Sequence, residues 1–375
     1  MTFPPRCLEA IVALSIGLFA SPIASAGEEP TDWKPGEAGK YLDEREKTWL
    51  ESTSAKRGQG SEQTSCISCH SVLPYLLARP LLRKFSGADK PTEYETKLLD
   101  RTKKRVENWK DLDTPSFGLF YDSDEQKKKE SWGTEAVLNA VVLALDDRYQ
   151  GRSAPSDLTK QAFSNLWKTQ ISTGDQKGTW DWLDFGLEPW ESKGARYFGA
   201  ALAAIAVGTA PGYYSPGADS EIDGKVSLLR DYLEKGLPAQ NLFNQTWALW
   251  ASARLDGVLT KDTKKKIVTQ LLDKQRDDGG WSLASLGSFA RHDGTAQDID
   301  SDGYATGLVL HVLQTAGVAK DDTKVAKGLA WLKKNQAMTG EWRGVSVNKK
   351  RDATTHVGKF MTDAATAYAV LALSH

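Results

Sequence analysis

From Trp132 to the end of the chain, apolar and amphipathic segments alternate. Five segments rich in alanine, glycine and other small residues begin near positions 132, 191, 244, 301 and 362. Each is apolar on most sides over more than three helical turns, which is typical of buried helices. Between them lie polar segments with one apolar side, such as "SDLTKQAFSNLWKTQ", "TKDTKKKIVTQLLDKQ" and "DDTKVAKGLAWLKKNQ". The pattern predicts an all-α fold built from repeated pairs of one inner and one outer helix.

A single helix pair cannot bury its own apolar face, so a repeat of this length predicts that neighbouring pairs stack. Two arrangements satisfy this requirement. The pairs could form an open solenoid, or the inner helices could form a ring inside a ring of outer helices.

A motif at the ends of the polar segments favours the ring. Three copies of Leu-x-x-x-Gln followed by Gly-x-Trp occur: Leu271, Gln275, Gly279 and Trp281; Leu332, Gln336, Gly340 and Trp342; and, with four extra loop residues, Leu166, Gln170, Gly178 and Trp180. The glycine allows the helix to end in a left-handed turn. We expect the tryptophan to fold back on the helix end, with its ring buried and its N–H near free carbonyls.

These repeats resemble the Gln–Trp motifs of squalene–hopene cyclases and of the related prenyltransferase helical toroids. The resemblance covers roughly residues 125–375. It implies an α/α toroid of about five to six helix pairs, and it makes 125–375 the predicted repeat domain.

The segment before the repeats carries a more specific chemical signature. In "TSCISCHSVL", Cys66 and Cys69 are followed directly by His70. In c-type haem proteins two thiols bind the haem vinyl groups covalently, and the adjacent histidine is the proximal ligand of the iron. A redox disulfide is the alternative, but such motifs open a helix after a strand, and the lead-in "SAKRGQGSEQTS" predicts a polar loop. A structural zinc site would need two more ligands, and there is no second cysteine pair.

Residues 32–118 are predicted to form a small helical segment that binds one covalent haem c. "GEAGKYLDEREKTWLESTS" predicts a helix. "SVLPYLLARPLLRKF" predicts short helical pieces interrupted by Pro74 and Pro80. The whole chain thus resembles bacterial exported proteins that join a haem-c motif to a cyclase-like toroid.

The second axial ligand of the iron is harder to predict. A typical cytochrome c uses a methionine downstream in the same small domain, but no methionine lies between Met1 and Met338. The remaining candidates are His292, His311, His356, His375, Met338 and Met361. We favour His356 as a distal ligand, because it lies in a predicted loop that is free to approach the iron. The alternatives are an open iron and an ordinary surface role for His356.

The first 26 residues predict export. Arg6 precedes an apolar run at 10–20, and Ala24, Ser25 and Ala26 follow, which is typical of a signal peptide cut after Ala26. The run is shorter than the roughly 20 apolar residues of a membrane span, although an uncleaved anchor is the alternative. The expected compartment is a bacterial periplasm. A net charge of −1 gives no electrostatic case for binding nucleic acid or an anionic membrane.

The cyclase resemblance raises the question of catalysis by the toroid. In that family an Asp-x-Asp-Asp run protonates an isoprenoid. Asp298 and Asp300 match its first two carboxylates, but Ser301 replaces the third. Since adjacent carboxylates make the strong acid, Asp298 and Asp300 are weak catalytic candidates. Alternatively, Asp300 or Ser301 could be the N-cap of the helix that starts at Gly303.

Three functions follow from these observations. The first, which we favour, is electron transfer or redox chemistry between the haem and a redox partner, or an apolar small molecule held by the toroid. The second is a gas-sensing or binding module with an open haem, since an electron carrier needs two strong axial ligands and a sensor needs one. The third is a cyclase-like lyase or isomerase that acts on an isoprenoid.

Overall fold

The computed structural model describes residues 33–57, 60, 63–109, 121 and 124–375. The predicted signal peptide (1–26) lies outside the described residues. Residues Trp33–His375 form one compact unit. This part of the chain is all-α, apart from a two-residue antiparallel hairpin of β1 (Lys56–Arg57) and β2 (Thr64–Ser65).

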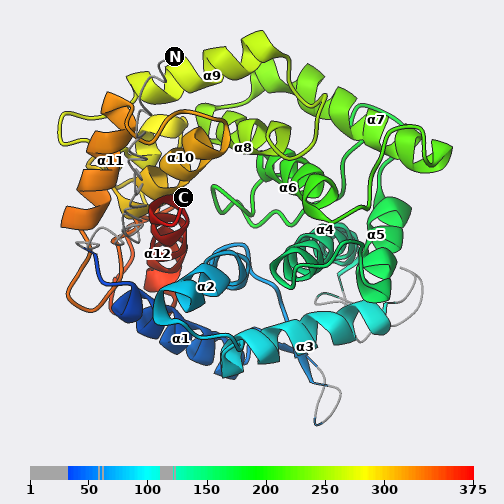
Figure 1. The fold of residues 1–375 in the computed structure, drawn as a ribbon, viewed down its shortest axis with the longest axis horizontal. Helices are drawn as coiled ribbons and strands as arrows, with labels where there is room; N and C mark the ends of the chain where they lie inside the picture. The colour runs from blue at the N-terminus through cyan, green and yellow to red at the C-terminus, as the bar shows by residue number, and fades with distance from the viewer. Residues whose placement is uncertain (1–32, 58–59, 61–62, 110–120, 122–123) are drawn as a thin grey trace, which may run out of the picture. The chain divides into compact units, whose positions relative to one another are not determined.

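Among the described residues, six helices whose side chains are mostly buried lie on the inside of this unit, as Figure 1 shows. They are α2 (Val72–Ser86), α4 (Glu125–Tyr149), α6 (Ala195–Thr209), α8 (Leu242–Ser252), α10 (Gly303–Thr315) and α12 (Phe360–Leu373). Each packs against the next in this order, and α12 packs against α2. The contacts between inner helices therefore form a closed circle.

The other six α-helices of the described residues have more exposed side chains and lie outside this circle, as Figure 1 shows. They are α1 (Pro35–Glu51), α3 (Glu93–Glu107), α5 (Asp157–Thr169), α7 (Ser220–Gly236), α9 (Lys261–Asp273) and α11 (Thr323–Lys334). Three short 3-10 helices, η2 (Leu237–Ala239), η3 (Leu283–Leu286) and η4 (Val357–Lys359), lie in the connections. The helices of the predicted haem segment belong to the same arrangement, because α1 and α2 both contact α12.

Two local predictions were wrong. The segment after the Cys-x-x-Cys-His motif is one helix, α2, and is not interrupted. Pro74 lies in its first turn, where a backbone N–H has no helical partner, and Pro80 lies inside the helix. The N-cap of α10 is Asp302, whose side chain accepts a hydrogen bond from the Ala305 N–H at 2.9 Å, and not Asp300 or Ser301.

The Gln–Trp motifs have the expected geometry. In all three copies the tryptophan ring is buried, and its Nε1–H donates to the carbonyl of the motif's own leucine at 2.7 Å. The glutamine bonds its own motif and the next outer helix. Gln275, for example, donates to the carbonyls of Gly279 at 2.8 Å and Lys324 at 2.7 Å. Each copy therefore fastens one helix pair to the next.

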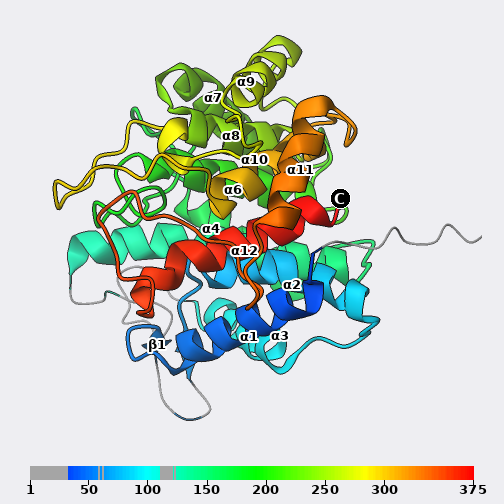
Figure 2. The ribbon, with the colours of Figure 1, turned by 90° about the vertical axis from the view of Figure 1, so that its left-hand side faces the viewer.

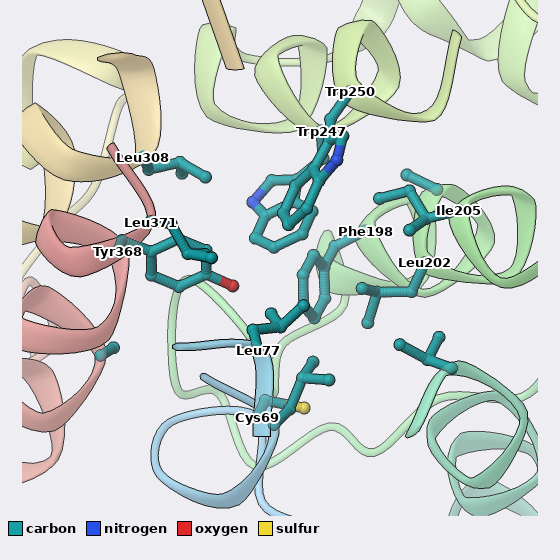
Figure 3. Packing of buried hydrophobic residues seen from close by; sticks show 14 of the residues in the cluster. Cys69, Leu77, Phe198, Leu202, Ile205, Trp247, Trp250, Leu308, Tyr368 and Leu371 are labelled. Carbon is teal, nitrogen blue, oxygen red and sulfur yellow. The ribbon is translucent and has the colours of Figure 1, made fainter. Parts of the chain in front are cut away.

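Aromatic side chains fill the space between the inner helices (Figure 3). The Trp247 ring lies 4.7 Å from Phe198, 5.1 Å from Trp250 and 5.9 Å from Tyr368, centroid to centroid. All four side chains are buried. These aromatic residues are core, and Cys69 of the Cys-x-x-Cys-His motif lies at the edge of the same cluster (Figure 3).

Candidate functional site

A cavity of about 220 Å³ is lined by two segments that are far apart in the sequence, the Cys-x-x-Cys-His motif and the residues at the start of α12. Its wall includes Cys66, Cys69 and His70, which immediately precede α2, and His356 and Phe360 at the start of α12. Figure 2 shows the loops that lead into α12 beside the N-terminal end of this helix. The rest of the wall includes Arg105 of α3, Glu135 in the first half of α4, and Phe185 and Glu191 in the loop before α6.

The two cysteines are free thiols in this arrangement. Burial raises the pKa of the Cys66 thiol to about 12 and also raises that of Cys69. Both thiols are therefore protonated at neutral pH, unlike the low-pKa thiolate of a disulfide oxidoreductase. The lead-in contains both short strands, β1 and β2, contrary to the loop expected. Neither cysteine opens a helix, however, since α2 begins only at Val72.

The imidazole of His70 is held in one orientation. Its ring stacks on Phe360 at 3.8 Å and meets Trp49 edge-on at 5.2 Å. Its Nδ1 lies 2.9 Å from Ser71 Oγ, and the Ser71 hydroxyl donates to Asp363 Oδ2 at 3.0 Å. Because that hydroxyl hydrogen goes to Asp363, the Ser71 oxygen accepts from the His70 Nδ1–H.

This hydrogen bond leaves the Nε2 lone pair of His70 available. Burial lowers the pKa of His70 to about 3, so the ring is neutral. A neutral imidazole whose other nitrogen donates to an oxygen partner is the usual state of a metal-ligating histidine. His70 is therefore prepared to ligate a metal ion through Nε2.

Asp363 of α12 is the centre of a buried polar network. Arg45 of α1 donates to both of its carboxylate oxygens, at 2.6 Å and 2.9 Å, and the Tyr41 hydroxyl donates at 2.9 Å. The Asp363 and Arg45 side chains are 2% and 8% exposed. The network joins the first helix, the last helix and the Cys-x-x-Cys-His motif through Ser71.

His356 has the opposite tautomer. Arg45 Nη2 donates to the His356 backbone carbonyl at 2.9 Å and lies 3.2 Å from His356 Nδ1. The two hydrogens of Nη2 go to the His356 carbonyl and to Asp363 Oδ2. Because arginine cannot accept and its positive charge is adjacent, a hydrogen on Nδ1 is disfavoured, and the hydrogen of the neutral ring is on Nε2. Burial, followed by the Arg45 charge, lowers the pKa of His356, which keeps the ring neutral. Among the described residues its Nε2 is buried and has no hydrogen-bond partner.

The other predicted axial ligands lie elsewhere, with one exception. Met361 lines a smaller cavity, of about 100 Å³, that His70 also lines. His311 is buried in α10 with its Nδ1 2.9 Å from His375 Nε2, and His292 contacts the carbonyl of Gly186. Met338 is 80% exposed.

The weak catalytic candidates do not line either cavity. Asp298 pairs with Arg343. Asp300 is 78% exposed and lies 3.9 Å from Arg276. The structure thus separates these carboxylates from the Cys-x-x-Cys-His motif.

Sequence reasoning missed Arg45, Ser71 and Asp363. One signal was available for Asp363, because it is the only charged residue in the apolar stretch "FMTDAATAYAVLAL". A buried charge on such a helix requires a partner. Within the described ranges there is no cluster of three or more histidine, cysteine or acidic side chains placed to hold a metal ion. No described helix is long and apolar enough to cross a membrane.

Comparison with known proteins adds information on the fold. No protein-family model matches the chain, and no curated protein matches it. Twenty-six chains of solved structures are similar. One is a glycosidase carrying a single glutamate-to-alanine substitution, with a TM-score of 0.51 and 10% sequence identity over 93% of this chain and 99% of that chain. This similarity extends to the fold alone.

Proposed function

We propose that the protein is an exported c-type haem protein in which a closed α/α toroid of six helix pairs encloses the haem site. The closed circle of contacts among the inner helices supports the toroid, as does the similarity to a helical glycosidase fold over nearly the whole chain. In this proposal the first pair, α1 and α2, carries the haem motif, and the remaining five pairs correspond to the cyclase-like repeats.

The observation that carries the proposal is the state of the motif within its cavity. Cys66 and Cys69 are free thiols on the wall that His70 also lines, and the Nε2 lone pair of His70 is available. These residues fit haem c. The thiols would form the two thioether bonds, and His70 would be the proximal ligand. When bound, the haem supplies one-electron redox chemistry.

The chain's own residues have definable roles in this chemistry. Asp363 acts through Ser71 to fix the His70 ring and to increase the basicity of Nε2. Phe360 and Trp49 pack against the ring and exclude water from one side of it. We propose that electrons pass to or from a redox partner or a small molecule at the cavity. The protein would act in a bacterial periplasm, after its signal peptide is cleaved behind Ala26.

The test is expression with a secretion system that attaches haem c. The intact mass should equal a chain starting at Gly27 plus one haem, and the absorption spectrum of the denatured protein should retain the haem bands. A Cys66→Ser/Cys69→Ser double variant is the matched control and should lose covalent haem. A wild-type protein without covalent haem, or with a disulfide between the two cysteines, would refute the proposal.

A further inference from the structure

We propose that His356 donates a hydrogen bond from Nε2–H to a small exogenous ligand in the cavity, and that it is not itself an iron ligand. The ligand belongs to the class of small molecules whose bound atom accepts a hydrogen bond, such as halide and azide anions. This inference rests on the proposed function, because it concerns a small ligand of a haem iron that Cys66, Cys69 and His70 would hold.

One ion pair sets the tautomers of both histidines. Asp363 accepts a hydrogen bond from the Ser71 hydroxyl, so the Ser71 oxygen accepts one from His70. The hydrogen of the His70 ring is therefore on Nδ1, and Nε2 carries a lone pair. Arg45, which pairs with the same Asp363, lies 3.2 Å from His356 Nδ1, where its positive charge disfavours a hydrogen and leaves the ring hydrogen on Nε2. The Arg45–Asp363 pair thus makes one histidine a metal ligand and the other a hydrogen-bond donor.

Arg45 also opposes the tautomer that iron ligation by His356 would require. To ligate through Nε2, His356 would have to carry its hydrogen on Nδ1. That hydrogen would then face the Nη2 hydrogens of Arg45, which is 3.2 Å away. Arg45 cannot retreat without losing its two bonds to Asp363 and its bond to the His356 carbonyl.

The Nε2–H of His356 lacks an acceptor among the described residues. The atom is buried, and a buried donor without a partner is unfavourable unless a ligand or water satisfies it. Both His356 and His70 belong to the wall of the same cavity. In the proposed haem protein His70 Nε2 would hold the iron. A small ligand of that iron could then accept a hydrogen bond from His356 Nε2–H in the same cavity.

The experiment is a titration of the ferric protein with fluoride and with azide, followed by absorption. We expect the wild type to bind both anions. His356→Ala should weaken fluoride binding about tenfold, which corresponds to ~1.4 kcal/mol for one lost hydrogen bond. His356→Gln, which retains an N–H donor, should recover part of the loss. His375→Ala, which removes a histidine outside the cavity, should leave fluoride binding unchanged.

The failure of this inference differs from the failure of the proposed function. If the wild type carries haem but binds no carbon monoxide when reduced, and His356→Ala restores binding, then His356 is the iron ligand and the inference is wrong. Unchanged fluoride affinity in His356→Ala would also overturn it. Absence of covalent haem would refute the proposed function, and the inference with it.

A second measurement uses only the wild-type protein, so it does not depend on whether a variant folds. The reduced carbon monoxide complex of the wild type is diamagnetic, so ¹⁵N shifts of selectively labelled histidines can be measured. We expect His356 Nδ1 to show the shift of an unprotonated nitrogen and Nε2 that of an N–H. The reverse assignment would contradict the inference.

Discussion

Gln336 and Lys34 exchange two hydrogen bonds across 302 positions of sequence. The Gln336 side-chain amide donates to the Lys34 carbonyl at 3.0 Å, and the Lys34 N–H donates to Gln336 Oε1 at 2.6 Å. The glutamines of the other two motif copies make the equivalent bond to the next outer helix, Gln170 to α7 and Gln275 to α11. The motif that fastens neighbouring helix pairs therefore also fastens the last pair to the first.

Gly340→Ala should disrupt this closure. Gly340 has a φ of +101°, and an added Cβ would lie 2.3 Å from the carbonyl group of Glu37. The matched control is Gly317→Ala, with a φ of +92° and no atom within 4 Å of the new Cβ. The control should lose about 1–2 kcal/mol for the left-handed backbone alone. Gly340→Ala should lose at least about 4 kcal/mol, because the clash with backbone is added to this strain. Urea unfolding measures both, and equal losses would contradict the account.

Trp281→Phe should show the value of one motif hydrogen bond. The ring of Trp281 is fully buried, and its Nε1–H satisfies the Leu271 carbonyl at the end of α9. We expect a loss of about 2–4 kcal/mol in the free energy of unfolding, from the lost hydrogen bond and the cavity together. The Leu271 carbonyl keeps its bond from the Lys274 N–H. Trp331→Phe removes a partly exposed bond to Asp278 and should cost less than about 1.5 kcal/mol. Similar losses in the two variants would argue against a structural role for the motif.

Asp363→Asn should lower the free energy of unfolding and, in the proposed haem protein, shift the midpoint potential. It leaves Arg45 as an uncompensated buried charge, for which we expect a loss of about 3–5 kcal/mol. Asp43→Asn is the control, because its pair with Arg79 is more exposed, with side chains 23% and 13% accessible. If the protein carries haem as proposed, Asp363→Asn should also make the midpoint potential more positive, since a less basic His70 stabilises the oxidised iron less. A redox titration that gives the wild-type potential would refute the role of Asp363 in orienting His70.

Asp302→Asn should flatten the pH dependence of stability in mildly acidic solution. Burial raises the pKa of Asp302 from 3.8 to about 6. Between these values the folded protein retains a proton that the unfolded chain has released, so stability falls as pH rises, by ~1.4 kcal/mol per pH unit. Asparagine also caps helices but does not titrate.

The comparison needs urea unfolding from about pH 4 to pH 7. Relative to wild type, Asp302→Asn should gain at most ~3 kcal/mol over this range. The exposed neighbour Asp300 provides the control, and Asp300→Asn should follow the wild-type curve. Parallel curves for wild type and Asp302→Asn would show that Asp302 does not titrate as described.

The sequence predicts those parts of the fold that depend on neighbouring residues. Alternating apolar and amphipathic segments identify inner and outer helices, and the spacing from Leu271 to Trp281 predicts a hydrogen bond within one motif. The choice of His356 as a distal ligand required the loop before α12 to approach the motif. The packing of the helices α1 and α2 themselves against α12 was not expected, because it joins residues some 300 positions apart and no local pattern marks them.

The same distinction applies to the site. Cys66, Cys69 and His70 are recognisable because their chemistry depends on adjacency in the chain. Arg45 and Ser71 are not, since their roles arise only when Asp363 is brought to them over 318 and 292 positions. The tautomer of His356 likewise depends on a contact with Arg45 that spacing alone does not reveal.

The long separation in sequence between the Cys-x-x-Cys-His motif and α12 determines when the thiols become enclosed. Ser71 contacts Asp363, which is synthesised 292 residues later, and His70 stacks on Phe360 of the same helix. While the chain is being synthesised, Cys66 and Cys69 therefore stay accessible to a modifying enzyme long after they have emerged. Enclosure follows the synthesis of α12, so any covalent attachment has an interval that ends when this helix folds into place. A chain that stops before α12 would keep that interval open indefinitely.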